Sequence, residues 1–205
     1  MFGAWKTSPV DYVRAVRRYD EENGSLEWAS PQDWMCEDVM LRKTGKTVAE
    51  HQRLTVDNFL ELRDLDAELA PIFAPVLQGQ TADDYLRCAD MYDRAGVDLA
   101  AQSIVGVGSV CRRQDTSEIG DVFSALSPLE LRLHGYGVKA GGLARYGKHL
   151  ASSDSLAWSA GARWAGAAGI KARPECTHKT CANCIYWALD WRDSVLATIA
   201  AGETS

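Results

Sequence analysis

Residues 97–109, VDLAAQSIVGVGS, form an apolar run that ends abruptly in glycine and serine. Four other runs end in the same way, and four of the five are followed by stretches with helical character. This order is typical of a parallel β/α chain whose chemistry lies at the carboxyl ends of its strands. It predicts a barrel-type active site. The other runs are residues 25–33 (SLEWASPQD), 72–79 (IFAPVLQG), 131–139 (LRLHGYGVK) and 150–159 (LASSDSLAWS).

The number of runs limits the architecture. Five β/α units do not close an eight-stranded barrel, which takes about 250 residues, and the chain has 205. The first expected helix begins at Ser8, and no strand is expected before it. We therefore expect an α/β fold that is either an open sheet or a (β/α) TIM-type barrel incomplete at its N-terminus. The expected domains are residues 1–160, the partial barrel, and residues 161–205, a Gly- and Ala-rich connection with a zinc loop and a final helix.

Capping residues mark the expected helices. Ser8 and Pro9 supply an N-cap and a first-turn proline for a helix that ends before Gly24. Thr47 and Glu50 fit a capping box at the start of a second helix. Further helices are expected from Thr81 to Gly96 and over residues 117–126, 140–150 and 182–200.

Composition describes a globular chain with a substantial core, since 46% of the residues are apolar and seven are tryptophan. No apolar run approaches the roughly 20 residues that span a bilayer. The first residues, MFGAWK, lack the order of a signal peptide. We therefore expect a cytoplasmic protein with no membrane partner.

The net charge of −6 argues against binding to nucleic acid through bulk electrostatics. The charge is uneven, however, because residues 1–105 carry a net −8 and residues 106–205 a net +2. Basic side chains of the second part are expected either to form a groove that follows phosphates or simply to lie on a solvated surface. These residues are Arg112, Arg113, Lys139, Arg145, Lys148, Arg163, Lys171 and Arg173.

Polar residues at three strand ends suggest a purine pocket. Asp33 is suited to accept from a ring N–H and an exocyclic amine, while Gln78 and the Gly108 N–H are suited to donate to a carbonyl. Gly106 and Gly108 let the backbone approach a ligand closely. Each signal has a structural alternative, because a strand-end aspartate often caps a helix and paired glycines often form a turn.

Asp154 is the second carboxylate of interest. Small residues flank it in the sequence SSDSLAW (152–158), which leaves space beside the side chain. Carboxylates in such positions act as nucleophiles that form covalent glycosyl intermediates. The alternative is an N-cap or turn aspartate with no chemical role.

Three thiols and an imidazole lie within nine residues, CTHKTCANC (176–184). Cys176, His178, Cys181 and Cys184 together supply the four ligands of a closed structural zinc site. The compact spacing also allows His178 to point away and the fourth ligand to come from elsewhere. An iron–sulfur cluster, which usually takes four cysteines, and three reduced thiols without metal are the alternatives.

The residues quoted above, taken together, resemble the deazapurine DNA-modification (DpdA-like) transglycosylases, relatives of the tRNA-guanine (queuine and archaeosine) transglycosylases. The resemblance covers nearly the whole chain in order. It rests on residues 28–37 (WASPQDWMCE), 75–79 (PVLQG), 107–113 (VGSVCRR), 134–139 (HGYGVK), 153–158 (SDSLAW) and 176–184.

The resemblance implies a barrel with a zinc appendage that exchanges guanine in DNA for a free 7-deazaguanine such as 7-cyano-7-deazaguanine, with RNA as the other polynucleotide it allows. It implies that Asp154 attacks C1′ and expels guanine, and that Asp33 acts on the base. Other residues would bind substrate (Gln78, Gly79, Gly106, Gly108, Gly137, Val138) or phosphates (Arg112, Arg113, Arg163).

The sequence departs from the family in two places. The Asp-x-x-Asp-Cys context of the tRNA enzymes is absent around Asp154, and no Asp-Ser-Gly-Gly-Phe stretch precedes residues 2–9. The second departure agrees with the strand count. A late start codon, a second chain that supplies the missing strands, and an inactive remnant all fit it. The competing function is therefore a non-catalytic, zinc-stabilised fragment that binds a purine or a partner protein.

Overall fold

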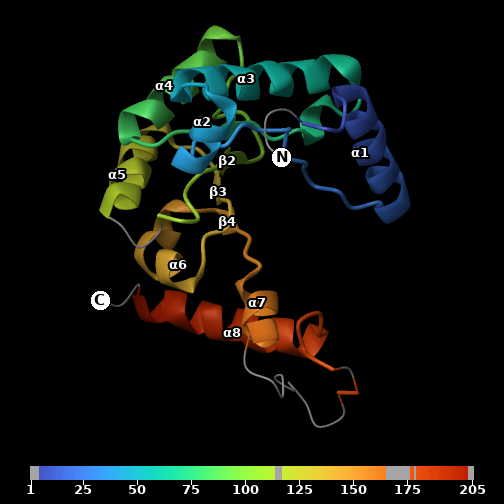
Figure 1. Cartoon of the computed structure of the whole chain (residues 1–205), viewed down its shortest axis with the longest axis vertical. Coiled ribbons are helices and arrows are strands. Elements are labelled where there is room, and N and C mark those ends of the chain that lie inside the picture. Colours follow the sequence, from blue (N-terminus) through green and yellow to red (C-terminus); the bar gives the residue numbers. More distant parts are fainter. Residues whose placement is uncertain (1–4, 114–116, 165–175, 178, 203–205) are drawn as a thin grey trace.

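A computed structural model describes residues 5–113, 117–164, 176–177 and 179–202 (Figure 1). No helix among these residues has the length and apolar character needed to cross a membrane. The helices are α1 (Pro9–Asn23), α2 (Asp38–Thr44), α3 (Val48–Leu65), α4 (Ala82–Arg94), α5 (Ser117–Leu126), α6 (Ala140–Tyr146), α7 (Ala157–Trp164) and α8 (Ile185–Gly202), and the strands are β1 (Val76–Leu77), β2 (Val105–Val107), β3 (Leu133–Gly135) and β4 (Ser152–Ser153).

The predicted caps begin and end the helices of the first half. The Ser8 hydroxyl accepts from the backbone N–H of Asp11 at the start of α1. Gly24 ends the same helix with a left-handed φ of 63°, a conformation that glycine adopts without steric cost. The capping box of Thr47 and Glu50 is present at the start of α3, and Thr81 caps α4 in the same way. These helix predictions are confirmed.

The sheet is parallel, with its strands in the order β1-β2-β3-β4. A parallel bridge between Ala29 and Phe73 adds one more position beside β1. Each of the five predicted apolar runs therefore contains at least one residue that pairs with a neighbouring strand. Strands that follow one another without a reversal of order wind in one direction and place their helices on one side, as in barrels. Within the described residues the sheet is open, and no closed barrel is formed.

The two faces of the sheet differ in chemistry. Leu77, Val105, Val107 and Leu133 belong to the main hydrophobic core together with side chains of α3, α4 and α5. The opposite face, which we call the inner face, carries small and polar residues at the paired positions Gly106, His134 and Ser152.

The inner face is concave. The ring centroids of Trp28 and His134 lie 4.8 Å apart, although their strands are separated by three inter-strand intervals, about 14 Å in a flat sheet. Tyr136 packs against His134 at the same centroid distance. Side chains from distant strands therefore converge over this face.

The structure differs from the prediction in three helices, two of them in the second half of the chain. Residues 150–159 contribute only two residues to β4, and α7 begins within this run, where no helix was expected. Helix α6 ends at Tyr146, because residues 147–149 tighten into a 3₁₀ turn. Helix α2 was also missed, because its seven residues are too few for a periodic pattern.

Candidate functional site

One residue from each strand contributes to a row across the inner face of the sheet. Val76, Gly106, His134 and Ser152 are paired across the sheet. Side chains two positions further along a strand lie on the same face. The next row therefore consists of Gln78, Gly108, Tyr136 and Asp154.

Asp33, which follows the Ala29 bridge, contacts this row through Gln78. The Gln78 amide nitrogen donates to the Asp33 carboxylate, and its oxygen accepts from the Ser109 hydroxyl at 2.6 Å. The same hydroxyl accepts from the Cys36 backbone N–H at 2.8 Å. Gln78 is fully buried, so its amide acts here as a link between Asp33 and Ser109.

Gly108 allows this arrangement because a Cβ at that position would lie 2.2 Å from the Gln78 amide nitrogen. Its backbone N–H donates to the Leu77 carbonyl at 3.0 Å, and its carbonyl accepts from the Tyr85 hydroxyl at 2.6 Å. The N–H that was expected to donate to a purine carbonyl is therefore engaged in the sheet.

Asp154 lies at the end of β4 and is held by two donors. One carboxylate oxygen is 2.9 Å from the Gly137 backbone nitrogen and 3.2 Å from the His134 Nε2. The Nδ1 of His134 is 2.8 Å from the Ser152 hydroxyl. His134 is buried, whereas 58% of the Asp154 side chain is exposed. The carboxylate is thus oriented on one side and open on the other.

The two carboxylates differ in acidity. Burial raises the pKa of Asp33 to about 6, with the Gln78 hydrogen bond opposing the shift. The hydrogen bond from His134 lowers the pKa of Asp154, and burial opposes that change. Acids whose pKa values are shifted in opposite directions suit different chemical roles.

Tyr136 lies close enough to both carboxylates for their charges to affect its hydroxyl. Burial raises the pKa of its phenol, and the negative charges of Asp33 and Asp154 add to the shift. Both acids therefore lie within electrostatic reach of one hydroxyl on the inner face. The Tyr136 ring lies over Gly106, where a Cβ would approach it to 2.4 Å. Beside Asp33 only a small cavity of about 20 Å³ remains, towards Trp34 and His51.

Three other predicted substrate-binding residues have structural contacts. A Cβ on Gly79 would lie 2.7 Å from the Asp84 Cβ, which shows close packing against α4. Val138 is buried in the main core. Gly137 has a left-handed φ of 67° and a backbone N–H that orients Asp154.

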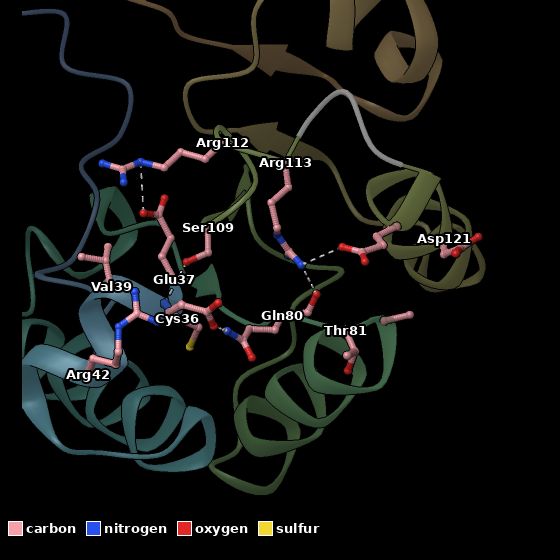
Figure 2. Close-up of a pocket in the computed structure, with 13 residues that line it drawn as sticks. Cys36, Glu37, Val39, Arg42, Gln80, Thr81, Ser109, Arg112, Arg113 and Asp121 are labelled. Atoms are coloured by element: carbon pink, nitrogen blue, oxygen red, sulfur yellow. Dashed lines mark hydrogen bonds and ion pairs between the residues drawn. The ribbon is translucent and has the colours of Figure 1, made fainter.

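Arg112 and Arg113 line a cavity of about 690 Å³ beyond the ends of β1 and β2 (Figure 2). Arg112 pairs with Glu37 at 3.3 Å, and Arg113 pairs with Glu118 at 3.5 Å. Both acids line the cavity too, so its charge is mixed. Arg163 is exposed at the end of α7. Phosphate binding by these arginines stays a prediction. Lys171 and Arg173 lie outside the described residues.

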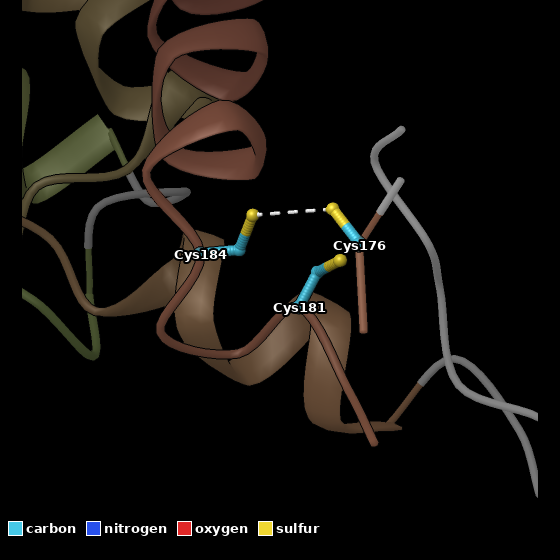
Figure 3. Close-up of side chains that lie close together, drawn as sticks. All are labelled: Cys176, Cys181 and Cys184. Atoms are coloured by element: carbon cyan, nitrogen blue, oxygen red, sulfur yellow. Dashed lines mark hydrogen bonds between the residues drawn. The ribbon is translucent and has the colours of Figure 1, made fainter. Parts of the chain in front are cut away.

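The cysteine cluster forms as the spacing predicted. The sulfur atoms of Cys176, Cys181 and Cys184 all lie within 4.8 Å of one another, and those of Cys176 and Cys184 are 3.8 Å apart (Figure 3). The backbone N–H of Trp187 lowers the pKa of Cys184, which favours the thiolate that binds metals. Three close cysteines therefore offer a metal-binding site. His178 lies outside the described residues.

Sequence reasoning missed the side chains that orient the two carboxylates. Ser109 adopts a φ of 58°, unusual for a residue other than glycine, and this turn brings its hydroxyl to Gln78. Residues 134–138 were expected to form one wall of the pocket, but the contact of His134 with Asp154 was not predicted, and Trp28 was quoted only as part of a longer motif. The Gly-Ser pair after a strand was the one available signal for Ser109, while nothing in the sequence pairs His134 with Asp154.

A family model described as DpdA, DeoxyPurine in DNA protein A, matches residues 1–203. No curated protein matches the chain.

Proposed function

The chain belongs to the DpdA family, and from this premise we propose that it exchanges guanine in DNA for a free 7-deazaguanine base. The family points to a role in deazapurine modification of DNA. The exchange reaction, the free base and the residues that act are our proposal.

One observation carries the proposal: an exposed carboxylate of lowered pKa and a half-buried carboxylate of raised pKa belong to the same concave face. Asp154 would attack C1′ of the target nucleotide, break the glycosidic bond and release guanine. The incoming deazaguanine would then attack the same carbon and free the carboxylate. His134 and the Gly137 N–H would hold one oxygen of Asp154, which leaves the other available for attack.

Asp33 would recognise the base. A carboxylate accepts from the ring N–H and exocyclic amine that guanine and 7-deazaguanine share, but a neutral carboxyl group does so less well. The Gln78 link to Ser109 would keep Asp33 aimed at the inner face. By the same proposal the parallel sheet is part of a (β/α) barrel, which the unreversed strand order and the concave face support.

The cysteine cluster fits structural zinc. Two thiolates bound to one tetrahedral zinc ion at about 2.3 Å have sulfur atoms about 3.8 Å apart, which is the separation of Cys176 and Cys184. We propose that Cys176, Cys181 and Cys184 hold Zn²⁺, with His178 as the fourth ligand. The ion would fix the loop before α8 and take no part in base exchange.

The test is incorporation of labelled 7-cyano-7-deazaguanine into duplex DNA, with Asp154→Asn as the key variant. Removal of a covalent nucleophile is expected to slow exchange by about a thousandfold or more. Because Asp154 is exposed, the variant should keep its fold, which circular dichroism can check. Exchange by Asp154→Asn at the wild-type rate would exclude the covalent role. RNA of the same sequence tests the choice of polynucleotide.

A second function, purine or partner binding without catalysis, is favoured by Tyr136. Its ring covers Gly106, so the side chain must move before a base can lie flat between the two carboxylates. Binding of 7-cyano-7-deazaguanine without any exchange, and with the same affinity in wild type and Asp154→Asn, would support this function over the first.

A further inference from the structure

A second cavity, of about 500 Å³, opens directly beside Asp154. Its wall is formed by Leu156, just before α7, and by the side of α7 that carries Ala160, Gly161 and Trp164. The volume lies within the range of ordinary small-molecule pockets. Because Asp154 itself lines the cavity, a molecule bound there would lie next to the group that we propose to attack the sugar.

The wall exposes large apolar side chains to an unusual degree. Trp164 is 81% exposed and Leu156 is 77% exposed. Leaving an indole and an isobutyl group in water forgoes the favourable free energy of burying them. Exposed apolar side chains that share one cavity usually mark a binding surface.

Helix α7 is held firmly enough to present such a surface. Its opposite side buries Ser159 and Ala162, and Ala162 belongs to the small core around the cysteines. The Trp187 indole N–H also donates to the Trp158 carbonyl at 2.7 Å, which ties α7 to α8. Trp164 therefore stands on a helix that is anchored from behind.

We propose that this cavity binds the nucleobase next to the target nucleotide, stacked on Trp164, as the DNA strand passes Asp154. The inference rests on the proposed function. Whichever sugar faces Asp154, its neighbour is covalently attached and must occupy the adjoining space. Apolar and aromatic surface suits the face of a base, and Lys139 adds positive charge to the lining near the phosphates.

The chemistry of the cavity separates this ligand from the free deazaguanine. Reading the edge of a base needs several fixed donors and acceptors, whereas this wall is formed by leucine, alanine, glycine and tryptophan. Stacking is tolerant of sequence, because every base has a π-face. We therefore expect little preference for the identity of the neighbouring base.

The experiment measures binding of a short DNA strand that carries fluorescent 2-aminopurine beside the target guanine, at one fixed salt concentration. Wild type should quench 2-aminopurine on binding. Trp164→Ala should lose the quench and bind about 5- to 150-fold more weakly, the range for losing one base–aromatic stack. Trp164→Phe should keep most of both signals. Tyr19→Ala, which removes another exposed aromatic side chain on α1, should behave as wild type.

Binding and quenching by Trp164→Ala within twofold of wild type would overturn the proposal. An equal loss of affinity for DNA and for free 7-cyano-7-deazaguanine would also overturn it, because the cavity would then serve the base. The outcome is separable from base exchange. If Trp164→Ala binds DNA more weakly but wild type shows no base exchange, the stacking site is supported and the exchange reaction is not. If wild type exchanges bases and Trp164→Ala binds DNA as wild type does, only the stacking site is rejected.

Discussion

Asp33 and Asp154 are the same chemical group in opposite surroundings. Asp33 is desolvated on the inner face and holds its proton up to a pH of about 6, whereas Asp154 is exposed and stabilised as an anion by His134. The difference follows from their neighbours and not from their places in the sequence. It leads to two predictions about pH.

Binding of the free base should depend on ionised Asp33. Affinity for 7-cyano-7-deazaguanine is expected to be constant above pH 7 and to fall about tenfold for each pH unit below 6, as the carboxylate takes up its proton. Calorimetric titrations at pH 5, 6 and 7.5 measure this. Asp33→Asn should bind weakly at every pH, and a pH dependence that survives in this variant would assign it to another group.

Protein stability should change in the opposite direction. The pKa of Asp33 is higher in the folded state than the usual 3.8 of an aspartate, so the folded state takes up the proton first as the pH falls. This contribution therefore stabilises the protein as the pH drops from about 7 through 6 towards 4. The urea midpoint of wild type relative to Asp33→Asn should rise across this window.

His134 is expected to act as a positioning residue for Asp154. In His134→Phe the ring packing with Trp28 is kept, but the main cause of the low Asp154 pKa is lost. The acid limb of the exchange-rate profile should therefore move to higher pH, so that the activity of the variant relative to wild type is lowest at the acid end of the profile. His149→Phe, which alters a histidine beside Phe123, is the control. A profile that superimposes on wild type would contradict this role.

Residue types predicted part of the site. The places of Asp33, Gln78 and Asp154 beyond strand ends were predictable, because each polar side chain ends or follows an apolar run. Their chemical roles stay predictions. The partners of these groups were not predictable. A hydrogen bond such as that from Ser109 to Gln78 joins positions 31 residues apart and depends on the left-handed turn at Ser109.

At the scale of elements, β1 is held to α4 by a side chain. The Tyr92 hydroxyl accepts from the Val76 N–H at 3.1 Å and donates to the Val76 carbonyl at 3.2 Å. Both residues are fully buried. The Tyr92 hydroxyl thus gives the N–H and the carbonyl of Val76 hydrogen-bond partners in place of a neighbouring strand.

Tyr92→Phe should therefore destabilise the protein by about 1 to 3 kcal/mol, the cost of leaving buried backbone groups without partners. Chemical denaturation measures this free energy of unfolding. Tyr19→Phe removes the same hydroxyl from an exposed position and should change stability by less than about 0.5 kcal/mol. Equal effects of the two substitutions would show that the hydroxyl of Tyr92 contributes nothing specific.

Helices with clear caps were predictable, and short or weakly capped ones were not. Helix α5 has the predicted bounds, residues 117–126. Helix α7 was not foreseen, because its small residues, AWSAGARW, resemble a flexible connection in sequence. Burial of Ser159 and Ala162 against the cysteine loop makes it a helix, and burial of that kind depends on tertiary contacts. The predicted domain boundary at 160/161 falls inside α7 and stays a prediction.

At the scale of the whole molecule, the described residues form two hydrophobic cores of unequal size. The main core joins the sheet to α3, α4 and α5, whereas the second contains Ala162, Ala182 and the three cysteines. Figure 1 shows the corresponding ends, with α3 and α4 at the top and α7 and α8 at the bottom. A small core of this kind usually needs a metal or disulfide to be stable.

Metal removal should act on the smaller core first. We expect one zinc ion per chain by atomic absorption, and its loss in Cys181→Ser or after chelation, with reduced helical signal from α7 and α8. Cys111→Ser should retain the metal, because Cys111 lies outside the cluster. Full helical content after complete chelation would contradict a structural role for the ion.

The strand order, the helix-capping residues and the cysteine cluster were predictable because each is a local pattern. Curvature of the sheet was not, because it results from Trp28, His134 and Tyr136 meeting across several strands.

Helix α7 turns one side to the thiols and the other to Asp154. Oxidation of the three sulfur atoms would therefore tilt the surface that carries Trp164. If the proposed DNA site is correct, redox damage at this end of the molecule would be measured as faster release of DNA, even while the Asp154 carboxylate stays intact.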